Sequence, residues 1–158
     1  GRCVERWVGG LGSLSPGCSL TVDLTGPTPP PFPSLLHQSL VDAHAWCYLG
    51  ELSLGGCRST SLPPLPPTLT ILNIQWSAIT HLADASPSPN PTLTRLDATG
   101  SALARLPGHL LGESTKLVSL AHCVHLSLVE AVATDWHSLC PHLTELDLGS
   151  CAAPTLPP

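Results

Sequence analysis

Cysteine and histidine are the side chains best suited to chemistry in this sequence, because both can bind metals and both can act in catalysis. Two groups of them lie close together, His122-Cys123-x-His125 and Cys140-x-His142. A structural zinc site usually combines a CxxC pair with a distant CxxC or HxxxH pair, and neither spacing occurs here. We therefore expect no metal and no other cofactor.

Motifs that carry catalysis are also missing. The sequence has no GxSxG nucleophile elbow, no phosphate-binding loop and no dinucleotide fingerprint. Asp135 and His137 flank Trp136, but no nucleophile is tied to them, so we interpret both as solvated residues of a helix face. We expect no enzyme activity and no small-molecule substrate.

The charge balance argues against nucleic-acid binding. Lys and Arg number 6 against 11 Asp and Glu, and charged residues make up 11% of the chain, compared with about 25% in an ordinary domain. Phosphate recognition requires clustered Lys or Arg, which the sequence lacks. A surface so poor in charge favours coverage by other proteins. No apolar run is long enough to span a membrane.

The cysteines favour an intracellular location, cytosolic or organellar. There are 7 of them, an odd number, and their spacing does not form the framework of a small secreted domain. Neither Asn73 nor Asn90 begins a glycosylation sequon. A reducing compartment fits this usage.

A recurring motif, LxxLxLxx, must position any site that the chain has. Its five copies begin at Leu49, Leu69, Leu93, Leu117 and Leu143, which are 20, 24, 24 and 26 residues apart. A period of about 20–29 residues with this pattern is typical of leucine-rich repeats. The sequence therefore resembles the leucine-rich repeat family clearly over residues 49–156 and weakly over residues 19–48.

The resemblance implies an α/β fold, a leucine-rich-repeat solenoid that forms a horseshoe segment. A curved parallel sheet would line its concave face, and short helices, turns and extended Pro-rich returns its convex face. We expect a loose arm at 1–17 and one repeat domain at 18–158, which opens with a degenerate repeat at 18–48. The first, fourth and sixth residues of each motif should point inward, because side chains alternate along a strand. The fourth positions form a spine of Leu52, Leu72, Leu96, Leu120 and Leu146.

The return segments differ along the chain. Apolar residues at spacings of three and four predict helices at 34–48 and at about 128–139. Ser127 and Glu130 have the spacing of a capping box for the second helix. Proline predicts extended or turn structure at 63–67 and 87–91.

The ninth position of each motif should hydrogen-bond the backbone of the turn. In this family it is usually Asn or Cys, and Ser can do the same more weakly. His122 at the sixth position and His125 at the ninth depart from the pattern and leave the register of the fourth repeat open. The five ninth positions are Cys57, Ser77, Ser101, His125 and Cys151.

Outward strand residues form the predicted protein-binding surface on the concave face. Trp76 and Arg95 are the best candidates for contacts, because exposed Trp and Arg are enriched as binding anchors. In the alternative interpretation, Trp76 folds onto the next repeat and Arg95 pairs with Asp97 or another neighbour. The full set of predicted site residues is Trp76, Arg95, Asn73, Gln75, Asp97, Glu145 and Asp147.

These observations predict a non-catalytic protein-interaction module that serves as a scaffold subunit of a large intracellular assembly. Two alternatives stay open. The chain could be the substrate-recruiting receptor of a ubiquitin-ligase complex, because its Cys-bearing repeats and predicted helical returns are similar to those receptors. It could instead be the regulatory domain of a larger protein.

Overall fold

A computed structural model describes residues 20–23, 48–62, 65–82, 92–105, 110–126 and 134–151. Several predictions fall outside these ranges: the arm at 1–17, the helix at 34–48 except for Tyr48, the capping box of Ser127 and Glu130, and the Pro-rich return at 87–91.

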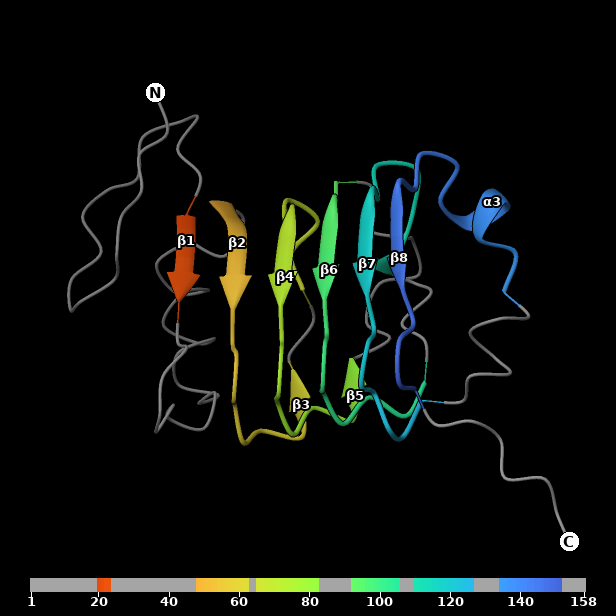
Figure 1. The fold of residues 1–158 in the computed structure, drawn as a ribbon. Coiled ribbons are helices and arrows are strands. Elements are labelled where there is room, and N and C mark those ends of the chain that lie inside the picture. The colour runs from red at the N-terminus through yellow and green to blue at the C-terminus, as the bar shows by residue number, and fades with distance from the viewer. Residues whose placement is uncertain are drawn as a thin grey trace, which may run out of the picture.

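A parallel sheet of six strands runs through the described residues (Figure 1). Neighbouring strands follow the order of the chain, so each repeat adds one strand beside the last. This arrangement is that of the predicted solenoid, in which each turn of chain passes from the sheet to a return segment and back. The strands are β1 (Leu20–Asp23), β2 (Leu49–Ser53), β4 (Ile71–Asn73), β6 (Arg95–Asp97), β7 (Leu117–Ser119) and β8 (Glu145–Asp147).

The sheet register aligns one inward residue from every strand in a row. Leu52 pairs with Leu72, Leu72 with Leu96, Leu96 with Val118, and Val118 with Leu146. Four of the five predicted spine residues therefore lie in this row. The prediction for Leu120 is wrong, because Val118 takes its place.

The fourth repeat begins two residues earlier than the leucine pattern predicts. With Val118 at the fourth position, Thr115 is at the first, Leu120 at the sixth and Cys123 at the ninth. Cys123 is fully buried, whereas His122, predicted to point inward, is exposed. The buried Thr115 can replace a leucine because its hydroxyl donates to the Leu93 carbonyl at 3.0 Å, and a buried hydroxyl with a partner avoids the penalty for desolvation.

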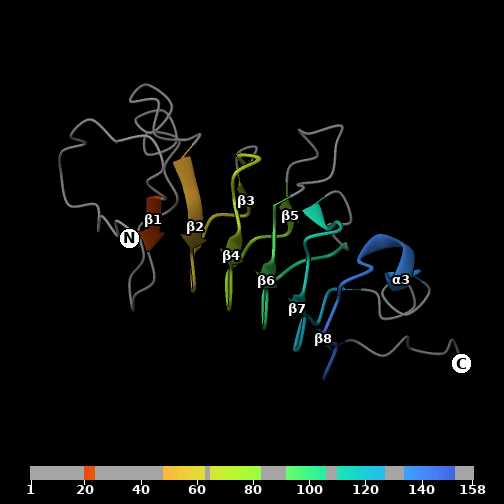
Figure 2. The ribbon, with the colours of Figure 1, turned by 90° about the horizontal axis from the view of Figure 1, so that it is seen from above.

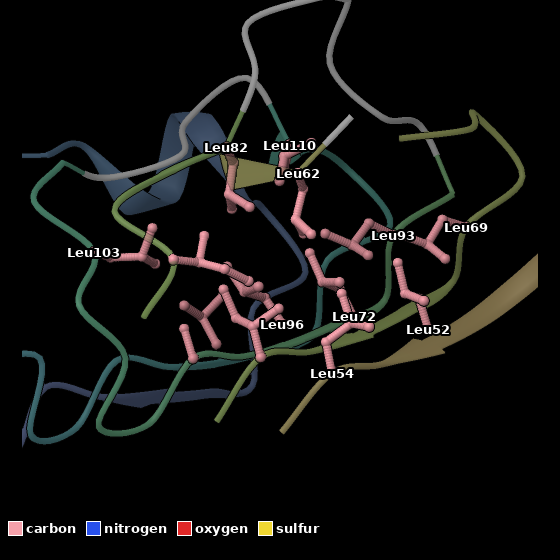
Figure 3. Packing of buried hydrophobic residues seen from close by; sticks show 14 of the residues in the cluster. Leu52, Leu54, Leu62, Leu69, Leu72, Leu82, Leu93, Leu96, Leu103 and Leu110 are labelled. Carbon is pink, nitrogen blue, oxygen red and sulfur yellow. The ribbon is translucent and has the colours of Figure 1, made fainter. Parts of the chain in front are cut away.

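Leucines from successive repeats fill the space behind the sheet (Figure 3). The first-position side chains of Leu49, Leu69 and Leu93 are fully buried, like those of Leu72 and Leu96 in the spine. Burial of each such side chain contributes about 1.5–3 kcal/mol by area transfer. At β8 the leucines at 143, 146 and 148 are only partly buried, since no described repeat covers their outer side.

Threonine side chains join the repeats where the chain enters each strand. The hydroxyls of Thr70, Thr94 and Thr144 donate to the carbonyls of Gly50, Thr70 and Lys116 at 2.8–2.9 Å. Each donor lies at the second position of its motif, so the bond repeats from one layer to the next. These side-chain bonds add to the backbone hydrogen bonds that join neighbouring strands of the parallel sheet.

The return side carries little regular structure among the described residues. A second, two-stranded parallel sheet joins β3 (Ser61–Leu62) to β5 (His81–Leu82), and it lies behind β4 and β6 (Figure 2). Residues 134–139 of the predicted helix at 128–139 are described, and there α3 covers Trp136–Leu139. The predicted end of the helix is confirmed, whereas residues 134 and 135 are not helical. Asp135 is the N-cap of α3, with its carboxylate accepting the Ser138 amide at 3.1 Å, which fixes the start of the helix.

Candidate functional site

The strands β2, β4, β6, β7 and β8 each end in a turn whose eighth-position residue has a left-handed backbone. Gly tolerates this conformation, whereas a bulky residue such as Trp is strained in it. The hydrogen bond that repeats along this row runs from each eighth-position amide to the next repeat, for example from Trp76 to the Thr99 carbonyl at 2.8 Å. The φ angles are 73° at Gly56, 52° at Trp76, 66° at Gly100, 58° at His122 and 57° at Ser150.

Trp76 lies across the neighbouring repeat. Its ring covers Gly100, where a Cβ atom would overlap the indole. The ring then reaches His122, with the ring centroids 6.1 Å apart and the planes 24° from parallel. Trp76 therefore bridges the row of turns from the second motif to the fourth. The ring therefore folds onto the next repeat, as the alternative interpretation predicts, and it still exposes 64% of its surface to solvent.

Asp97 is the centre of a polar network on the sheet. Its carboxylate accepts hydrogen bonds from the side-chain amide of Gln75 at 2.6 Å, the Arg95 guanidinium at 3.3 Å and the Thr99 hydroxyl at 2.9 Å. The Thr99 and Ser119 hydroxyls lie 2.8 Å apart and extend the network to β7. Asp97 is buried by these partners, although the strand alternation places it on the outer side of the sheet. Arg95 is paired as the alternative interpretation predicts, with half of its side chain exposed.

Asn73 and Asp147 do for their repeats part of what Asp97 does for the third. Asn73 Oδ1 accepts a hydrogen bond from the backbone N–H of Gln75 at 3.0 Å, and Asp147 Oδ1 accepts one from the backbone N–H of Gly149 at 2.9 Å. Each bond closes a local turn where its strand ends. These fifth-position residues consequently hold backbone in place, while Asp147 and Glu145 on β8 are also exposed to solvent.

The ninth-position side chains of two repeats donate hydrogen bonds to backbone carbonyls. Cys123 donates to the Ala98 carbonyl at 3.1 Å and Cys151 to the Leu120 carbonyl at 3.0 Å. Desolvation raises the pKa of both thiols above the ordinary value, which makes each a neutral donor and a weak nucleophile. The prediction that the ninth-position side chain bonds the turn backbone is confirmed for these two. The prediction of His125 at this position is wrong, because Cys123 holds it.

The structure therefore brings six of the predicted residues together as two groups. Asn73, Gln75, Arg95 and Asp97 lie on the adjacent strands β4 and β6 or directly after them, and Glu145 and Asp147 lie together on β8. Trp76 sits at the strand-end turn, beside Gln75 in sequence. The sequence pattern places Thr99 and Ser119 on the outer side of the sheet, although the predicted site residues do not include them, and it misses His122. The leucine pattern placed His122 at the inward sixth position. Alignment of Cys123 with the ninth position would have placed His122 at the exposed eighth position.

The described ranges contain no group of three His, Cys, Asp or Glu side chains placed to hold a metal ion. Within the same ranges, no helix has the length and apolar character needed to cross a bilayer.

Comparison with known proteins agrees with the repeat geometry. The family described as Leucine Rich repeat matches residues 139–152, which include β8 and its strand-end turn. A search of curated proteins found no significant match. The stacked parallel strands, the inward leucine rows and this match support a leucine-rich repeat solenoid for this chain. Domains of this family are typically non-catalytic modules that bind other proteins.

Proposed function

We propose that the chain is a scaffold subunit of a large intracellular protein assembly and binds its partner through the sheet face. We define the sheet face by the outward third- and fifth-position residues of the strands, with Trp76 at its strand-end margin. The family supports protein binding in general. The scaffold role and the location rest on the low charge and the cysteine usage of the sequence.

The observation that carries the proposal is the geometry of Trp76. Its equivalents Gly56 and Gly100 show that the turn does not require a large side chain. A tryptophan there adds backbone strain and leaves most of an apolar ring in water. Residues held in strained conformations cluster at binding sites, and exposed Trp is enriched among the residues that dominate binding energy.

The surroundings of Trp76 make a pre-organised contact surface. Gly100 and His122 fix the ring, and the bonds of Asp97 hold Gln75 and Arg95 beside it. A partner that binds here orders few side chains, and less ordering leaves more of the contact energy as affinity.

Replacement of Trp76 by Ala tests the proposal. We expect Trp76→Ala to weaken the association with the native partner by about 30-fold or more, since a binding anchor contributes at least about 2 kcal/mol. The thermal midpoint should change little, because the ring contributes to no buried layer. Affinity purification followed by titration of the recovered complex measures both quantities. Val124→Ala is the matched control, since Val124 is also exposed, at 59%.

Crosslinking on the native complex locates the surface independently. Lys116 is the lone lysine, so a reagent for carboxylates is required, and we expect crosslinks at Glu51 and Glu145. Crosslinks confined to the return side, together with unchanged binding by Trp76→Ala, would remove the sheet face from consideration. If the natural protein purifies alone as a stable monomer, the proposed role as an obligate subunit fails.

The runner-up role is a substrate receptor of a ubiquitin ligase. The hydrogen bonds of Cys123 and Cys151 favour it. They give cysteine a structural role in the repeat, and the Cys-bearing repeats of this chain are similar to those of the receptors. This role requires an adaptor-binding helical module elsewhere in the full-length protein. The full reading frame therefore separates the two roles.

A further inference from the structure

The charges of the sheet face are unevenly distributed across its strands. Glu51 lies on β2, and Glu145 and Asp147 lie together on β8. Between these flanks, Arg95 and Asp97 form an ion pair at 3.3 Å and contribute no net charge. Among the described third- and fifth-position residues of β2 to β8, the balance is thus acidic, and the acids outside this ion pair lie on β2 and β8.

Along the third position, an apolar side chain lies on each side of Arg95. The register places Ile71 beside Arg95 and Arg95 beside Leu117, and Leu117 then pairs with Glu145. Ile71 and Leu117 are each partly exposed on the outer side of the sheet. The row from β2 to β8 therefore reads as acid, apolar, Arg, apolar, acid.

From this complementarity of charge, we infer that the sheet face binds a basic segment of a partner protein, with Lys or Arg at both ends and apolar residues in its centre. The inference rests on the proposed function and adds to it the chemistry of the partner. Basic ends would meet Glu51 on one side and Glu145 with Asp147 on the other. Opposite potentials across an interface steer the encounter and fix the register of the two partners.

The spacing of the strands sets the length of the segment. Four strand intervals separate β2 from β8, and at about 4.8 Å each they span about 19 Å. A helix rises about 1.5 Å per residue, so about 13 residues would reach from flank to flank. In extended form, about 6 residues would cover the same distance.

Selection from a display library of random peptides about 16 residues long tests the inference without assuming a sequence. The immobilised target is this chain. We expect the enriched peptides to carry Lys or Arg near both ends, and their affinity to fall as salt rises. Glu51→Lys and Glu145→Lys should each weaken the binding of a selected peptide about tenfold, because each change places like charges together. Glu113→Lys is the matched control, since Glu113 is exposed in a turn that precedes β7.

The possible failures have different meanings. Enriched peptides that are neutral or acidic, yet lose binding with Trp76→Ala, would overturn the inference about charge and leave the proposed binding face in place. Basic peptides that bind the Glu51→Lys, Glu145→Lys and Glu113→Lys variants equally well would overturn it too. If no peptide is enriched, or none responds to Trp76→Ala or to either flank variant, both the inference and the proposed face fail.

Discussion

At the eighth position of the repeat, the placement of one side chain depends on the eighth-position residue of the next repeat. The Trp76 ring can lie flat because its neighbour in the row is Gly100, which has no side chain. His122, one repeat further, then closes the stack. A large residue at one turn is thus accommodated by a glycine at the next.

Gly100→Ala should destabilise the chain and displace Trp76. The new methyl group would overlap the indole, and alanine at a φ of +66° is itself unfavourable by about 1–2 kcal/mol. Urea unfolding measures the loss. In a Trp76→Ala background the steric part disappears and only the backbone part should persist. Equal losses in both backgrounds would contradict the packing of Trp76 on Gly100.

Ser77 offers a stabilising substitution. Its hydroxyl is buried and has no hydrogen-bond partner among the described residues, and such a group carries a desolvation penalty. We expect Ser77→Ala to leave the free energy of unfolding unchanged or to raise it by up to about 1 kcal/mol. The control is Ser101→Ala, which removes the contact with Cys123 at 3.5 Å and should lower stability by about 0.5–1.5 kcal/mol. A greater loss of stability for Ser77→Ala than for Ser101→Ala in urea unfolding would contradict the absence of a partner for the Ser77 hydroxyl.

At the scale of the element, α3 depends on a single side chain at its start. The Ser138 hydroxyl and amide donate to the Asp135 carboxylate at 2.6 Å and 3.1 Å. These bonds, the hydroxyl first, lower the pKa of Asp135 below its ordinary value. A carboxylate stabilised in this way favours the folded state wherever it is ionised.

The contribution of Asp135 should therefore depend on pH. Because the folded pKa is the lower one, the stabilisation is present above the unfolded pKa and is lost as the pH falls through the folded pKa. Asp135→Ala should lower the thermal midpoint at pH 7 and have a smaller effect in strong acid. Melting curves from pH 7 down to pH 2 measure this difference. A Ser138→Ala control should show a weaker version of the same trend, and a difference independent of pH would refute the cap.

The fourth repeat is the element in which packing overrides the leucine pattern. Its first position holds Thr115, and its spine position holds Val118. Valine fits a strand because its branched side chain packs well on a pleated surface. Leu117, which the pattern places inside, instead lies on the outer side of the sheet.

At the scale of the whole molecule, stability should decline from the centre of the stack to its β8 side. Leu96 is fully buried between two layers, whereas Leu146 is partly exposed. Leu96→Ala should therefore cost about 2–5 kcal/mol. Leu146→Ala should cost less, since fewer neighbours surround it. Urea unfolding of the two variants provides the comparison, and equal losses would mean that Leu146 is as well covered as Leu96.

Much of the fold could be predicted from the sequence. A strand and its inward leucines recur at each motif, and one repeat can bury its leucines only against the next. The phase of Leu52, Leu72, Leu96 and Leu146 was therefore sufficient to predict a parallel stack, which the structure confirms. The site residues could be placed on the outer side of the sheet for the same reason.

Only the tertiary structure decided the register of the fourth repeat, the burial of Asp97 and the position of the Trp76 ring. Each depends on residues in other repeats: Leu93 for Thr115, Gln75 for Asp97, and Gly100 with His122 for Trp76. The alternation of side chains along one strand determines which side a residue faces. Whether that residue is then buried, paired or open depends on atoms that come together only when the repeats stack.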